Sequence, residues 1–130
     1  MKKLSELYKS EDWKNEKHAP LIETTGTIVK NEYFKVEVSV GKEIEHPNTV
    51  EHHIRWIELY FLPAGKDTPQ HVATFDFTSH GENGDGKETG TYTHPCAATC
   101  MKVDGDGTLL ASSYCNIHGL WQTEKELECG

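Results

Sequence analysis

The fold of this chain is decided by one alternating stretch, Tyr33-Phe34-Lys35-Val36-Glu37-Val38-Ser39-Val40. Its apolar side chains recur at every second position from Phe34 to Val40. This is the period of a β-strand that buries one face and leaves the other in water. Gly41 ends the pattern. The stretch therefore predicts a strand over residues 33–40, lying with one face on a core.

Further strand patterns follow on the C-terminal side. Residues 54–62 form a run whose bulk is β-branched or aromatic, which favours a strand. Residues 71–78 and 108–115 indicate two more strands. The segment 92–103 indicates a weaker strand, and Pro95 within it favours a sheet edge or a bulge.

The remaining segments have the composition of loops. Residues 1–20 are polar and irregular, residues 79–91 are rich in glycine and charge, and the chain closes with Leu120, Trp121 and a charged tail. No stretch has a helical period over ten or more residues. Short strands separated by turns predict an all-β chain, an immunoglobulin-like antiparallel β-sandwich.

Length and charge narrow the classes of function. A chain of 130 residues fits one domain, expected to span 1–130. The formal net charge of −8 argues against nucleic acid and anionic membranes as partners. No apolar run approaches the roughly 18–20 residues that span a bilayer. The N-terminus has no apolar region behind its charges, so we expect no secretory signal and a cytoplasmic protein.

Three clusters of chemically active residues lie in or beside loops at the ends of predicted strands. They are Glu16-Lys17-His18-x-Pro20, His46-Pro47-x-x-x-Glu51-His52-x-Ile54-x-Trp56-Ile57 and Cys115-x-x-His118-Gly119-x-Trp121. A Cys-x-x-His pair alone is a weak signal for a metal site. It gains weight here because the other histidines also lie in loops, near prolines that fix the backbone. The residues by themselves indicate a β-sandwich with a metal site of histidine and cysteine ligands.

Taken together, these clusters resemble the superoxide reductases, namely the single-iron neelaredoxin type and the iron domain of desulfoferrodoxin. The resemblance runs from Trp13 to Trp121, and Val40-Gly41-Lys42-Glu43-Ile44 leads into the second cluster as it does in that family. The first twenty residues would carry the first ligand loop. No cysteine precedes Cys96, so we expect the one-iron form, without the separate four-cysteine iron domain of desulfoferrodoxin.

The resemblance implies a role for each residue of the clusters. Cys115 would supply an axial thiolate, and Glu16 would occupy the sixth position of ferric iron and leave ferrous iron. Lys17 would draw superoxide towards the site. Four histidines would bind the iron in a plane: His18, His46, His52 and His118.

The reaction implied is the one-electron reduction of superoxide to hydrogen peroxide at a mononuclear non-haem iron. An external electron carrier such as rubredoxin would then reduce the iron again. The single-iron family also implies a homo-oligomer, expected to be a tetramer.

Two alternatives without superoxide chemistry remain. A cupredoxin-like electron-transfer protein needs only two histidines and usually an axial methionine after the last one, but no methionine follows His118. A structural zinc module prefers four ligands in a tetrahedron, and five candidate ligands fit it poorly.

Residues outside the ligand set receive structural interpretations. His53 follows His52 directly and should point to the opposite face of a strand, so it is given no metal role. Trp56 and Trp121 are expected to pack around the site. Surface positions are predicted for His71, His80 and His94, packed or free thiols for Cys96 and Cys100, and an exposed thiol for Cys129.

Overall fold

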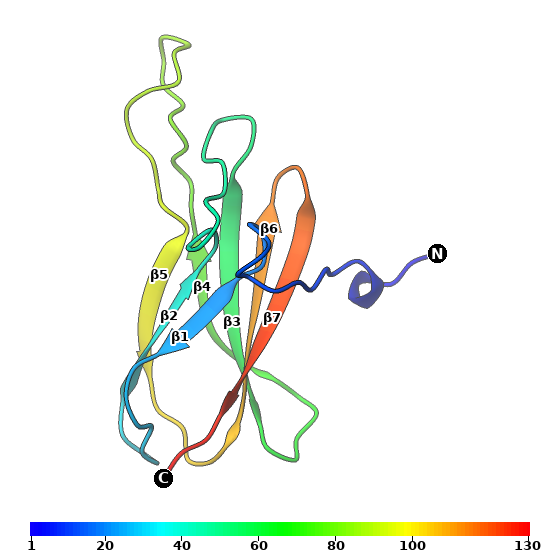
Figure 1. Ribbon diagram of the computed structural model, residues 1–130, viewed down its shortest axis with the longest axis vertical. Helices are drawn as coiled ribbons and strands as arrows, with labels where there is room; N and C mark the ends of the chain where they lie inside the picture. The colour runs from blue at the N-terminus through cyan, green and yellow to red at the C-terminus, as the bar shows by residue number, and fades with distance from the viewer.

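The computed structural model describes all 130 residues and consists of two antiparallel sheets (Figure 1). The strands of the first sheet run in the order β1 (Leu21–Thr24), β2 (Phe34–Ser39) and β5 (Cys96–Met101). Those of the second run in the order β4 (Gln70–Asp76), β3 (Ile54–Pro63), β6 (Gly107–Cys115) and β7 (Gly119–Leu127). The predicted all-β sandwich is confirmed. The one helical element is the short 3-10 helix η1 (Leu4–Glu6), and no helix is long and apolar enough to cross a membrane.

The core lies between the two sheets and follows the alternation seen in the sequence. In β2, Val36 and Val38 are buried while Lys35 is exposed. In β6, every second residue from Gly107 to Cys115 is buried. Because Cys115 is the last of these inward positions, its thiol lies at the end of the core with no exposed surface.

Two strands were not predicted. The strand β1 has only four residues and pairs with β2. The composition of the C-terminal segment predicts a charged tail, yet residues Gly119–Leu127 form the strand β7. It pairs with β6 along its whole length, from Leu127 opposite Gly107 to Gly119 opposite Cys115. As an edge strand, β7 exposes its glutamates at one side. Its sequence therefore lacks the apolar alternation of β2.

The weak strand predicted over 92–103 forms only in its second half. The strand β5 begins at Cys96, directly after Pro95, whose carbonyl accepts a hydrogen bond from the Val40 amide at 2.9 Å. Proline has no amide hydrogen to donate to a sheet, so pairing starts after it. The expectation of an edge strand is confirmed, since β5 lies at the end of its sheet.

The N-terminal segment runs from the projecting helix η1 to the edge of β7 (Figure 1). There the amide of Lys9 donates to the carbonyl of Leu120 at 3.0 Å, and the carbonyl of Lys9 accepts from the Gln122 amide at 2.9 Å. Further along, the Ser113 hydroxyl donates to the carbonyl of His18 at 3.4 Å. These contacts carry the first histidine of the sequence to the end of β6.

Two glycines shape the loops at this end of the sandwich. Gly41 has a φ of +85°, and a Cβ on it would lie 2.7 Å from the backbone nitrogen of His46. Gly119 has a φ of +80° and closes the three-residue loop between β6 and β7. Both conformations are easy for glycine and strained for other residues. The loops that hold His46 and His118 therefore depend on glycine.

Candidate metal centre

Five side chains from four segments of the chain meet at one end of the sandwich. Cys115 ends β6, and His118 lies in the loop that follows it. His46 and His52 lie in the loop between β2 and β3, and His18 lies just before β1. These are the five histidine and cysteine ligands expected from the sequence, and the fold brings them together.

The ligand atoms of these side chains converge. The Nδ1 of His118 lies 3.1 Å from the Nε2 of His18, 3.2 Å from the Nε2 of His52 and 3.8 Å from the Sγ of Cys115. Four of these residues form a group whose ligand atoms all lie within 4.8 Å of one another: His18, His46, His52 and Cys115. Imidazole nitrogens this close repel or compete for a proton unless a cation lies among them, so the arrangement suits a bound metal ion.

His46 gives the clearest evidence that the site fits a metal. Its Nδ1 lies 2.6 Å from the carbonyl oxygen of Pro47, so that bond sets the orientation of the ring. Its Nε2 is buried and has no hydrogen-bond partner. A buried polar atom without a partner costs free energy, and a metal ion bound at Nε2 would remove this cost.

Neighbouring groups orient the other ligands. The Nδ1 of His18 lies 2.5 Å from Oε1 of Glu16, which turns the Nε2 of the ring towards the cluster. On its other side, the His18 ring stacks on Trp121 with 4.8 Å between centroids and 10° between planes. The amide of His118 donates to the Cys115 sulfur at 3.4 Å. Contacts of this kind fix the orientation and basicity of metal ligands.

The pKa values of the site histidines favour metal binding. Burial lowers the pKa of His46 to about 4, and the positive charges of its neighbours add to this. Burial is also the main reason that the pKa values of His18 and His52 are lowered. The charge of Lys17, the residue before His18, contributes to the lowering of all three pKa values. At neutral pH these imidazoles are uncharged and can donate a lone pair to a cation.

Glu16 lies outside the cluster in this structure. Its Oε1 contacts His18 as described, and its Oε2 accepts from the backbone amides of His18 at 2.5 Å and Ala19 at 3.0 Å. Burial raises the pKa of the Glu16 carboxyl, but these bonds outweigh it and lower the pKa below its ordinary value. The half-buried Lys17 has no hydrogen bond or ion pair. The roles expected of Glu16 and Lys17 therefore stay predictions.

The structure corrects two interpretations outside the ligand set. His80 was predicted at the surface but is 4% exposed, with its ring stacked on that of His53. Cys129 was expected to be exposed and is half-buried. The surface positions of His71 and His94 are confirmed. Of the two tryptophans expected at the site, Trp121 contacts His18, whereas Trp56 stacks on Tyr114.

The sequence predicts no role for three residues that hold the ligand loops: Asn48, within the loop of His46 and His52, and its neighbours His80 and Asn116. Asn116 lies inside the Cys-x-x-His motif, so a signal for it was present. Nothing in the sequence around His80 indicates that it is buried.

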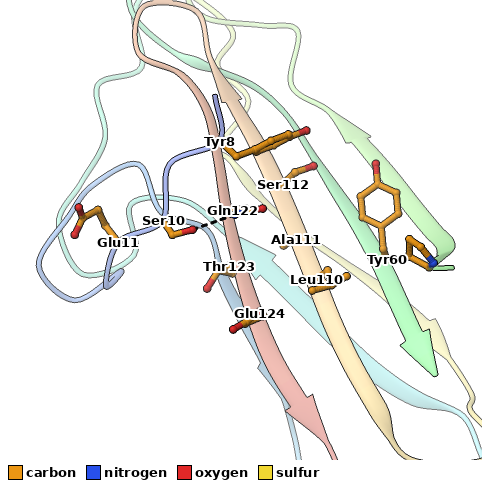
Figure 2. Close-up of a pocket in the computed structure, with 11 residues that line it drawn as sticks. Tyr8, Ser10, Glu11, Tyr60, Leu110, Ala111, Ser112, Gln122, Thr123 and Glu124 are labelled. Carbon is orange, nitrogen blue, oxygen red and sulfur yellow. Dashed lines mark hydrogen bonds between the residues drawn. The ribbon is translucent and has the colours of Figure 1, made fainter. Parts of the chain in front are cut away.

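The largest cavity of the molecule lies elsewhere. It has a volume of about 680 Å³ and lies on the outer face of β3, β6 and β7, where Tyr8 of the N-terminal segment faces Tyr60 (Figure 2). Gln122 and Ser10 also line the cavity, and Nε2 of Gln122 donates to the Ser10 hydroxyl at 3.2 Å. We assign the functional site to the histidine and cysteine cluster, because side chains hold a metal ion directly and no large cavity is needed.

The fold and the cluster together define a β-sandwich protein with a metal centre of histidine and cysteine ligands. Comparisons with known proteins identify the family. The family model described as desulfoferrodoxin matches residues 10–124, and the chain therefore belongs to the desulfoferrodoxin family and, within it, to the superoxide reductases of the neelaredoxin type.

Individual relatives agree with this assignment along almost the whole chain. The superoxide reductase of Pyrococcus furiosus is 52% identical over 126 residues, which is 96% of this chain and 99% of the relative. The neelaredoxin of Megalodesulfovibrio gigas is 47% identical, with 95% of each chain covered. A crystal structure of a Thermotoga maritima protein superposes with a TM-score of 0.95 at 44% identity, covering 100% of this chain and 99% of the other. The family and the donor set indicate a single non-haem iron.

Proposed function

We propose that this chain reduces superoxide to hydrogen peroxide, consuming one electron and two protons for each superoxide. The ligands of its iron would be Cys115 and four histidines: His18, His46, His52 and His118. One observation carries the proposal. The Nε2 of His46 is buried without a partner and belongs to a group of ligand atoms within 4.8 Å of one another. The names of the relatives, superoxide reductase and neelaredoxin, support the reaction.

The donor set suits this chemistry. Iron bound here would supply the electron by cycling between its ferrous and ferric forms. Cys115 provides a soft sulfur ligand from the buried end of β6, and the His118 amide that points at this sulfur stabilises negative charge on it. The neutral imidazoles add no charge. The cysteine and the histidines thus play different electronic roles.

Lys17 and Glu16 are proposed to act on the approach to the centre. The protein carries a net charge of −8, which repels an anion at long range, so a lysine beside the cluster would provide local attraction for superoxide. Glu16 would be a further ligand of the iron in its oxidised form. To become one it must give up its bonds to His18 and Ala19, and such a movement would couple its position to the redox state.

Partners and location follow the family expectation. The electron donor would be a small external carrier such as rubredoxin, and the chain would form a homo-oligomer, expected to be a tetramer. The location would be the cytoplasm, where cysteines stay reduced, and none of the four cysteines forms a disulfide.

The stoichiometry of the reaction tests the proposal. Iron-loaded protein, reduced anaerobically and supplied with an excess electron donor, should form one hydrogen peroxide for each superoxide and release no oxygen. A dismutase would form half as much peroxide and release oxygen. Oxygen release in proportion to superoxide consumed would contradict the proposed reaction, and no consumption above that of the metal-free protein would contradict the assignment as an enzyme.

A further inference from the structure

The loop that carries His46 and His52 is held by two side chains that lie outside it. One is Asn116. Its Nδ2 donates to the carbonyl of Glu51 at 2.9 Å, and its Oδ1 accepts from the amide of His53 at 2.8 Å. The Asn116 amide also donates to the carbonyl of His53 at 3.2 Å. Asn116 therefore binds the residue on each side of His52.

The position of Asn116 in the chain gives these bonds their significance. It directly follows Cys115 and lies two residues before His118. Its side chain thus joins the loop of the cysteine ligand to the loop of His52, whose Nε2 lies 3.2 Å from the Nδ1 of His118. Asparagine combines one donor and one acceptor in a short, planar side chain. Aspartate of the same shape keeps the acceptor only.

His80 holds the other part of the loop. Its Nδ1 lies 2.8 Å from Oδ1 of Asn48 and its Nε2 lies 2.8 Å from the carbonyl oxygen of Phe77. Asn48 follows His46 by two residues, and its Nδ2 is fixed by a 3.0 Å bond to the carbonyl of Thr93. His80 therefore ties the His46 part of the loop to the end of β4.

A stacked pair of rings completes this contact. The rings of His80 and His53 lie 3.5 Å apart between centroids, with 8° between their planes, and both residues are buried. The Nδ1 of His53 lies 2.8 Å from the carbonyl oxygen of Thr49. The loop is thus fixed at residues 48, 49, 51 and 53, on both sides of His52.

We propose that Asn116 and His80 are positioning residues that set the geometry of the metal centre without touching the metal. The inference rests on the proposed function in that the cluster must bind a metal. Loss of either side chain leaves part-buried polar groups of the loop unpaired, namely the His53 amide or Oδ1 of Asn48. His46 and His52 then lose their fixed places relative to Cys115. Changes of this kind around metal ligands weaken metal affinity by roughly 10–100-fold.

Binding of Co²⁺ to the metal-free protein tests the inference without any superoxide chemistry. Asn116→Ala, Asn116→Asp and His80→Gln would be titrated with Co²⁺, recording the affinity and the absorption from thiolate to cobalt. Asn83→Ala is the matched control for asparagine, because Asn83 is exposed and makes its donor and acceptor bonds to Thr89 and Asp85, outside the ligand loops. His71→Gln is the control for histidine, since His71 is exposed and its ring contacts Thr74 of β4 and Glu58 of β3, outside the ligand loops.

The three test variants should bind Co²⁺ about 10–100-fold more weakly and with a shifted thiolate band, with Asn116→Asp less affected than Asn116→Ala. The controls should behave as the parent protein. Unchanged affinity and band in folded Asn116→Asp and His80→Gln would overturn the inference. If circular dichroism shows that Asn116→Ala is unfolded, the result for Asn116→Asp, whose side chain has the same shape, decides whether Asn116 is a positioning residue.

The same titration separates the two proposals. A parent protein that binds Co²⁺ through a thiolate but forms no peroxide from superoxide would overturn the proposed function alone. A parent protein that binds no Co²⁺ would overturn both.

Discussion

Trp121 lies flat against His18, with 10° between the ring planes and 4.8 Å between the centroids. The tryptophan is 7% exposed and its Nε1 has no hydrogen-bond partner. Its ring is therefore held by packing and by the Lys9 ammonium, 5.4 Å from the ring centroid, and it supports the ligand loop of His18 from the side of β7.

Replacing this tryptophan should destabilise the protein through lost packing. Trp121→Ala should lower the free energy of unfolding by about 3–5 kcal/mol, as large-to-small core changes do. Trp121→Phe keeps an apolar ring against His18 and removes the unpaired Nε1, so its loss should be smaller. Urea unfolding of the metal-free proteins measures both. An alanine variant as stable as the parent would show that the stack contributes nothing.

The thiolate ligand can be tested by a single atom change. Cys115→Ser should abolish peroxide formation and the colour that a thiolate gives to ferric iron, because a hydroxyl is a poor substitute for a charged sulfur. The test uses iron-loaded protein oxidised by one equivalent of a one-electron oxidant. Cys100→Ser is the control, since Cys100 is exposed on β5. Full colour and activity in Cys115→Ser would refute the assignment of the sulfur ligand.

The charge of Lys17 should appear in the salt dependence of the rate. Lys17→Ala should slow the reaction with superoxide by about 10-fold or more at low ionic strength, the lower limit for local steering of a charged substrate. Added salt should slow the parent protein and leave the variant less affected, because ions screen the lysine. The control is Lys14→Ala, as Lys14 is exposed over the ring of Trp13. Equal salt dependence in parent and Lys17→Ala would argue against steering by Lys17.

Gly41 should be intolerant of a side chain for two separate reasons. Gly41→Ala meets a strained positive φ and places a Cβ 2.7 Å from the backbone of His46. Gly26→Ala measures the cost of the positive φ alone, because Gly26 has a φ of +75° and an added Cβ would meet nothing within 4 Å. The strained φ should lower the free energy of unfolding of each variant by about 1–2 kcal/mol, which urea unfolding measures. Only Gly41→Ala should also bind Co²⁺ more weakly, and equal metal affinity in both variants would contradict the steric argument.

Thiol reactivity should separate Cys96 from Cys100. Burial raises the pKa of Cys96 to about 11, and the Glu37 carboxylate, which accepts a 3.0 Å bond from its sulfur, contributes. Since the thiolate is the reactive form, Cys96 should be alkylated slowly at pH 8 and rapidly only as the pH approaches 11. Glu37→Gln should lower this pKa and speed the reaction near pH 9. Mass spectrometry of iodoacetamide adducts measures the rates, with exposed Cys100 as the internal reference.

The sequence predicts those parts of the fold that depend on local pattern. The strand with Val36 and Val38 follows from alternation, and so does the absence of long helices. The strand β7 is not predicted, because an edge strand exposes polar residues and shows no apolar alternation. Its pairing with β6 depends on the other strand and not on its own sequence. The burial of His80 is not predicted for a similar reason, since it depends on contacts with Asn48 and His53, which are distant in the sequence.

The candidate site shows the same division. The motifs around His18, His52 and Cys115 predict a metal centre because the residue types themselves carry the chemistry. The motif does not predict the hydrogen bonds of the Asn116 side chain, because their partners, Glu51 and His53, are 65 and 63 residues away in the sequence. Ligands are visible in a sequence, whereas the groups that position them emerge only from tertiary contacts.

The 3.1 Å contact between His18 and His118 joins residues 100 positions apart. A chain folded only in part cannot form this centre, because its first ligand precedes β1 and its last follows β6. A bound metal would join segments from both ends of the chain, and its binding free energy would add to the stability of the complete fold. Iron content should therefore report how much of a preparation is fully folded, and starving cells of iron should increase the turnover of this chain.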